Sequence, residues 1–128
     1  MSYYFSKILD TSFENALERT VDALKENGFG VLTEIDIQAT LKKKLDVDYP
    51  KYRILGACNP TFAHKALQSE SNIGLMLPCN VIVKELQDKT VEVSAIDPIA
   101  SMQAIENPSL GDVAIAVQAL LKKVIDSL

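Results

Sequence analysis

Apolar residues recur along the chain with two different periods, one typical of helices and one typical of strands. Between residues 13 and 24 they return every three or four positions, as on one face of a helix. From residue 31 to 37 the period is two, with an acidic outer face and an inner face made of Val31, Thr33, Ile35 and Ile37. The pattern predicts a helix that ends at Gly28, followed by a half-buried strand.

Short local signals mark where helices are expected to begin. Thr11, followed three residues later by Glu14, fits a capping box for the first helix. Asn59 and Asn107 each precede a proline. Asparagine caps free helix amides, and proline needs no hydrogen-bond partner in the first turn. We therefore expect helices to start directly after Thr11, Asn59 and Asn107.

The remaining segments complete an α+β order. Further strands are expected at residues 3–8, 52–57, 77–86 and 90–96, with a short helix at 38–45 and a helical turn within 98–105. The last two strands are separated by the short polar segment 87–89, which favours an antiparallel hairpin. The order β-α-β-α-β-α-β-β-α predicts one domain over residues 1–128, with a mixed, largely antiparallel sheet and helices packed on one face.

The last expected helix, from residue 108 to the end of the chain, has more apolar surface than one buried stripe requires. Its apolar residues include Leu110, Val113, Ile115, Val117, Leu120, Leu121, Val124, Ile125 and Leu128. We therefore expect this helix to contact a second partner, and a homodimer formed through it or through the sheet is the prediction.

Composition and charge narrow the class of protein. Of the 128 residues, 48% are hydrophobic and 23% charged, as in ordinary globular domains. The formal net charge of −4 argues against a nucleic-acid partner or an anionic membrane surface, because both favour a basic field. The sequence contains neither a secretory signal nor an apolar run of the roughly 18 residues that a membrane helix needs. A cytoplasmic protein without a membrane partner is expected, and its two cysteines should be reduced.

Two Cys-Asn dipeptides are the best candidates for a functional site. Cys58 precedes an expected helix start, where free amides and the helix dipole stabilise a thiolate. Cys79 opens an expected strand. Either thiol could instead simply fill the core, because cysteine is among the most buried residues. Asn59 and Asn80 could cap backbone groups or orient a bound ligand.

Other chemistry is weakly supported. His64 with the two cysteines matches none of the tight spacings of zinc sites, so no metal site is predicted. Glu34 and Asp36 share one strand face and Asp97 closes another strand, but solvent exposure accounts for all three. The sequence has no glycine-rich phosphate loop and no nucleophile elbow. No catalytic residue and no cofactor are assigned.

Three segments together resemble the domain-of-unknown-function 302 family. They are residues 28–36 (GFGVLTEID), 53–60 (RILGACNP) and 77–81 (LPCNV), and the resemblance extends nearly end to end, with Asp97, Pro98 and Met102 included. It implies a compact α+β fold similar to the TATA-box-binding-protein-like class, usually as a homodimer, in bacterial and archaeal proteins without an established activity. DNA binding is not implied, because fold alone does not transfer function.

Three functions remain open at this stage. The first is a homodimeric module that binds a small ligand or another partner, with a shared site at Cys58, Asn59, Cys79 and Asn80. The alternative is thiol-based redox, sulfur or soft-metal handling through Cys58 and Cys79. A third keeps both thiols as core residues. The first two require that the two Cys-Asn segments, which are far apart in the sequence, meet in the fold.

Overall fold

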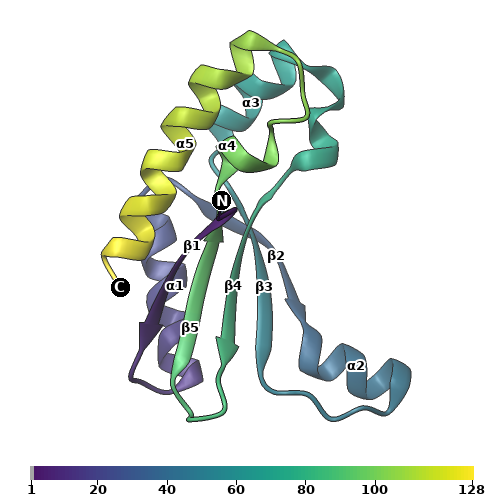
Figure 1. The fold of residues 1–128 in the computed structure, drawn as a ribbon, viewed down its shortest axis with the longest axis vertical. Helices are drawn as coiled ribbons and strands as arrows, with labels where there is room; N and C mark the ends of the chain where they lie inside the picture. The colour runs from purple at the N-terminus through teal and green to yellow at the C-terminus, as the bar shows by residue number, and fades with distance from the viewer. Residues whose placement is uncertain (1) are drawn as a thin grey trace.

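The computed structural model describes residues 2–128 as a five-stranded sheet with helices on one face (Figure 1). In chain order the elements are β1 (Tyr4–Leu9), α1 (Phe13–Glu26), β2 (Gly30–Asp36), α2 (Ile37–Leu45), β3 (Tyr52–Cys58), α3 (Pro60–Ser69), the 3₁₀ helix η1 (Ser71–Met76), β4 (Cys79–Glu85), β5 (Val91–Ile96), α4 (Pro98–Ser101) and α5 (Pro108–Asp126). The strands lie in the order β1-β5-β4-β3-β2, and each neighbouring pair is antiparallel. The predicted α+β class and element order are confirmed.

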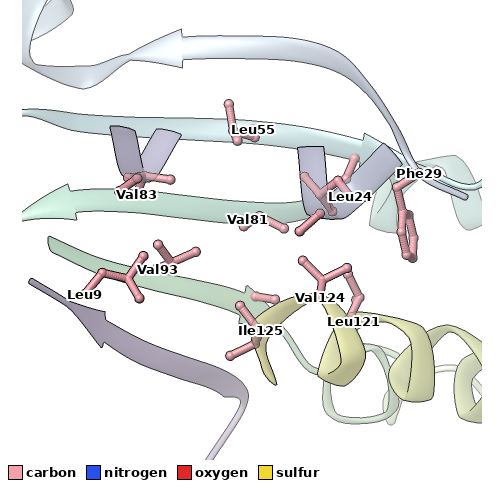
Figure 2. Close-up of a cluster of buried hydrophobic side chains, with 14 of the residues drawn as sticks. Leu9, Leu24, Phe29, Leu55, Val81, Val83, Val93, Leu121, Val124 and Ile125 are labelled. Atoms are coloured by element: carbon pink, nitrogen blue, oxygen red, sulfur yellow. The ribbon is translucent and has the colours of Figure 1, made fainter. Parts of the chain in front are cut away.

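The main core lies between the sheet and the two long helices α1 and α5. Leu55, Val81 and Val93 point from three adjacent strands toward these helices (Figure 2). Leu24 of α1 and Leu121 of α5 meet them and are fully buried. Alternate residues of each central strand therefore supply the buried face, as a period of two requires.

The helix caps confirm two predictions and correct a third. Asn59 and Asn107 accept hydrogen bonds from first-turn amides of α3 and α5. The capping box at Thr11 is wrong, because α1 begins one residue later than that motif needs. Ser12 is the N-cap and accepts from the Asn15 amide at 3.1 Å, whereas the Thr11 hydroxyl accepts from the Asn15 side chain.

Strand β2 departs from the predicted alternation because it contains a bulge. Val31 lies opposite Ala57, but Thr33 lies opposite the preceding residue, Gly56, so Leu32 is the extra residue. Ala57 and Gly56 face opposite sides of the sheet, and their partners do too. The prediction that Val31 and Thr33 share one face is therefore wrong, and β2 is a largely exposed edge strand.

After the bulge, the acidic side chains of β2 are paired rather than free. Glu34 and Asp36 lie on the same face as Arg53 of β3, whose guanidinium reaches them at 2.9 and 3.4 Å. One arginine fork thus bridges two partly exposed carboxylates. This explains the acidic face as a surface ion-pair cluster, which contributes little to stability.

The wide apolar surface of α5 is largely used within the chain. Its C-terminal half packs on the sheet and α1, and its N-terminal half packs on α3 and α4 (Figure 1). Ile115 remains 58% exposed. Self-association through this helix stays a prediction. Among residues 2–128, no helix has the length and apolar character needed to cross a membrane.

Candidate functional site

The structure brings the two cysteine segments to the same end of the sheet. Cys58 is the last residue of β3, and Cys79 is the first residue of β4 and lies opposite Ala57. Cys58, Asn59 and Cys79 all line one cavity of about 30 Å³ between the sheet and α3, α4 and α5. The remaining wall is apolar and includes Phe29, Ala57, Phe62, Leu77, Met102 and Val117.

Asn80 does not belong to this cavity. It lies opposite Gly56 on the helix-free face of the sheet, where its side chain is exposed. Consecutive residues of a strand point to opposite faces, so Cys79 and Asn80 necessarily separate. Of the four residues in the predicted site, three meet at the cavity and the fourth lines a different hollow on the other face.

Burial controls the chemistry of the Cys79 thiol. Burial, with the neighbouring charge of Cys58 as the smaller cause, raises the pKa of Cys79 to about 11. Cys79 therefore stays protonated near neutral pH, where a thiol is a poor nucleophile. Both cysteines are free rather than disulfide-bonded. The cavity thus presents an uncharged sulfur at Cys79, surrounded by apolar groups.

Asn59 has a structural task at the edge of the cavity. Its side-chain oxygen accepts from the Phe62 amide at 3.3 Å and caps α3. Its amide nitrogen faces Gly28, where an added Cβ would lie only 3.1 Å away. Gly28 also has a φ of +84°, which favours glycine. Asn59 therefore joins the start of α3 to the turn after α1.

Comparison with known proteins agrees with this architecture. Residues 5–128 match the model of the family described as Domain of unknown function DUF302. The chain belongs to this family. Its fold is similar to the crystal structure of an uncharacterized conserved DUF302 protein from Bacillus stearothermophilus, with a TM-score of 0.90, 25% sequence identity and coverage of 98% of each chain. No curated protein matches the chain.

His64 lies outside the candidate site of this DUF302 chain. It is on α3 but does not line the cavity. Among the residues that the structure describes, no three His, Cys, Asp or Glu side chains gather closely enough to hold a metal ion. The sulfur-bearing residues that line the cavity are Cys58, Cys79 and Met102.

Sequence reasoning missed Gly56, which determines how this end of the DUF302 sheet packs. A Cβ there would lie 2.7 Å from Cγ of Pro78 and would overlap the Thr33 side chain. The glycine therefore lets Pro78, the residue before Cys79, lie directly against β3. A glycine inside a strand is the signal that could have indicated this close approach.

Proposed function

We propose that this DUF302 chain is a homodimeric cytoplasmic module that binds a small uncharged ligand at the Cys58–Cys79 cavity. The observation that carries the proposal is that two free thiols, distant in the sequence, line one apolar cavity. Free cysteines also support a reducing compartment. Asn59 serves the site by holding the start of α3, and Asn80 faces away from it.

The cavity selects for small size and lack of charge. A cavity needs roughly 10–15 Å³ to hold one water molecule, so about 30 Å³ accommodates one small group. A charged group placed among these apolar side chains would lose its hydration without a partner, which is costly. The expected ligand is therefore a small apolar molecule, or a larger one that inserts an apolar end.

Xenon is a suitable probe because it is apolar and polarisable and enters dry cavities. We expect xenon pressure to shift the backbone amide signals of Ala57 and Ala66 in two-dimensional NMR spectra. Cys79→Leu should fill the cavity and abolish the shifts. Val83→Leu is the matched control, because Val83 is buried on the same strand but does not line the cavity. Shifts that are missing in the wild type, or that persist in Cys79→Leu, would count against the site.

The β2 edge and α2 support the homodimer. None of the nine described residues of α2 is buried, and the helix projects away from the sheet (Figure 1). A helix this short is marginal in water unless another surface packs against it. Exposed apolar side chains gather on this part of the chain, namely Leu32, Ile35, Leu45, Val47 and Tyr49. We propose that a second copy covers them.

Light scattering tests this interface. We expect a particle of twice the 14.1 kDa chain mass at micromolar concentration. Leu45→Glu should reduce the mass to that of one chain, whereas Ile115→Glu on the exposed side of α5 should leave it unchanged. Dissociation by Ile115→Glu alone would move the interface to α5, and a single-chain mass for the wild type would reject the homodimer.

Thiol chemistry is the second candidate, because two free cysteines line the same cavity. A disulfide between them would release two protons and two electrons, which a low-molecular-weight disulfide can accept as it is reduced to two thiols. Incubation with oxidised glutathione followed by mass spectrometry tests this. A Cys58–Cys79 disulfide, seen as the loss of two hydrogen atoms, supports the redox candidate, whereas two unmodified thiols or a stable glutathione adduct argue against it.

A further inference from the structure

The helix-free face of the sheet contains a hollow that is separate from the cysteine cavity. Its volume is about 290 Å³, close to the lower limit of about 300 Å³ for typical small-molecule pockets. Its polar and aromatic lining comprises Tyr3, Tyr4, Tyr52, Asn80, Lys84, Glu92 and Ser94. Apart from Tyr3, these residues come from β1, β3, β4 and β5.

Strand register explains why these side chains meet. Ile82 of β4 lies opposite Ser94 of β5, and Lys84 lies opposite both Tyr52 of β3 and Glu92 of β5. Paired residues share a face, and residues two apart on one strand do so as well. The hollow therefore has an isoleucine and a serine at its floor, with larger polar and aromatic groups around them.

Two polar side chains in the hollow have no hydrogen-bond partner in the part of the chain that the structure describes. Ser94 is only 6% exposed, and neither its hydroxyl nor the Asn80 amide makes a side-chain hydrogen bond among residues 2–128. Every fully enclosed side-chain nitrogen or oxygen among the described residues does have a partner, so the Ser94 hydroxyl must open onto the hollow. These two groups are available to a ligand.

The charges in the hollow cancel each other. Lys84 and Glu92 form an ion pair at 3.2 Å, and the hydrogen bond that Lys84 donates to the Glu92 carboxylate raises the pKa of Lys84, which keeps the ammonium charged. The pair is neutral overall, so the hollow offers no net charge to an ionic ligand. The hollow therefore favours an uncharged occupant over a phosphate, a carboxylate or a nucleic-acid backbone.

The tyrosines favour a flat occupant. Tyr3 and Tyr4 pack edge to face with ring centroids 5.0 Å apart, and Tyr52 borders the hollow from β3. Tyr3 is 64% exposed and Tyr4 is 40% exposed, so their rings remain open to further contact. Aromatic rings gain additional stabilisation from offset or edge contacts with another ring.

We propose that this hollow is a second binding site, which takes an uncharged planar heteroaromatic molecule. The ring of the ligand packs against Tyr4 and Tyr52, and its polar edge exchanges hydrogen bonds with Asn80 and Ser94. Both side chains are able to donate and accept, so they match a ring edge that carries donors and acceptors side by side. This site does not depend on the cysteine cavity, which lies across the sheet.

Free adenine is the probe, followed by two-dimensional NMR of the full chain. We expect saturable shifts of the backbone amides of Asn80 and Ser94. Asn80→Ala and Ser94→Ala should each raise Kd by about three- to tenfold, the loss expected for one hydrogen bond. Ser6→Ala is the matched control and should leave Kd unchanged, because Ser6 lies opposite Ser94 on the same face but does not line the hollow.

Several outcomes would overturn the proposal. Four of them are no saturable shift up to the solubility limit of adenine, equal binding of toluene, unchanged affinity in both Asn80→Ala and Ser94→Ala, and shifts of the same amides on dilution of the protein alone. The last result would assign the face to a second copy. Salt-sensitive binding of single-stranded poly(A) that is tighter than that of adenine would overturn it as well, in favour of nucleic acid. Ser94→Ala removes only an unpartnered hydroxyl, so its fold should survive.

Discussion

Raising the pH should destabilise the folded chain through one buried thiol. Burial, followed by the charge of Cys58, raises the pKa of Cys79 from 9.0 to about 11. The unfolded chain therefore loses this proton near pH 9, whereas the folded chain keeps it until about pH 11. Between these two pH values the folded state binds more protons than the unfolded state. The stability that the Cys79 thiol contributes is therefore fully present below pH 9 and is lost as the pH rises through 11.

The size of the effect follows from the shift. One pKa unit corresponds to about 1.4 kcal/mol, so the full loss is about 3 kcal/mol, of which about 2 kcal/mol is reached by pH 10.5. The assay is urea unfolding at pH 7.5 and pH 10.5 of the wild type and of Cys79→Val. Lysines and tyrosines titrate in the same range, and the difference between the two proteins removes their contribution.

Equal losses of stability in the wild type and in Cys79→Val would refute this reasoning, since the thiol would then ionise equally easily in both states. Alkylation gives an independent check. In a Cys58→Ser background at pH 8, burial, the larger cause, still raises the pKa of Cys79 and lowers its thiolate fraction relative to an ordinary cysteine. Iodoacetamide should therefore modify the folded protein more slowly than the urea-unfolded protein, by at most about a hundredfold, the ratio set by the full two-unit shift.

Substitutions at three further positions test the packing by urea unfolding. Gly56→Ala should lower the free energy of unfolding by about 1–3 kcal/mol, because its Cβ would overlap Thr33 and Pro78, and an unchanged midpoint would contradict that crowding. Asn59→Ala should cost about 1 kcal/mol through loss of the α3 cap, and Asn59→Asp, which can still accept, should restore most of it. Leu121→Ala should cost about 2–5 kcal/mol because Leu121 is fully buried, and a loss below 1 kcal/mol would mean that α5 does not close the core.

Local signals in the sequence were enough to place most helices and strands. Helical spacing and the Asn-Pro caps act over four residues or fewer, so they can be recognised without knowing the fold. The bulge at Leu32 could not be recognised in this way, because the alternation continues in the sequence while the pairing shifts by one residue. The second surface contacted by α5 was predicted, but whether that surface belonged to the chain or to another copy depended on where α3 and α4 lie.

The candidate site was predicted in part for a similar reason. Cys58 and Cys79 meet because β3 and β4 pair with a register that no local pattern specifies. The separation of Asn80 from Cys79 could have been predicted, since neighbours on a strand always face opposite sides. The hollow behind Asn80 could not, because β1 and β5 are distant in the sequence and meet only in the sheet order β1-β5-β4-β3-β2.

Cys79 and Asn80 are consecutive residues of β4 and face opposite sides of the sheet. The sites on both faces therefore depend on the same register of β4 against β3 and β5. A slip of β4 by a single residue against its neighbours would turn the strand over. Asn80 and Lys84 would then enter the apolar interior, and Val81 and Val83 would be exposed to water, at a large cost in free energy. The alternation that places the Cys79 thiol and the Asn80 amide on opposite faces therefore makes other registers of β4 unfavourable. A ligand bound in the cysteine cavity or in the hollow would also stabilise this register of β4, on which the site on the opposite face depends.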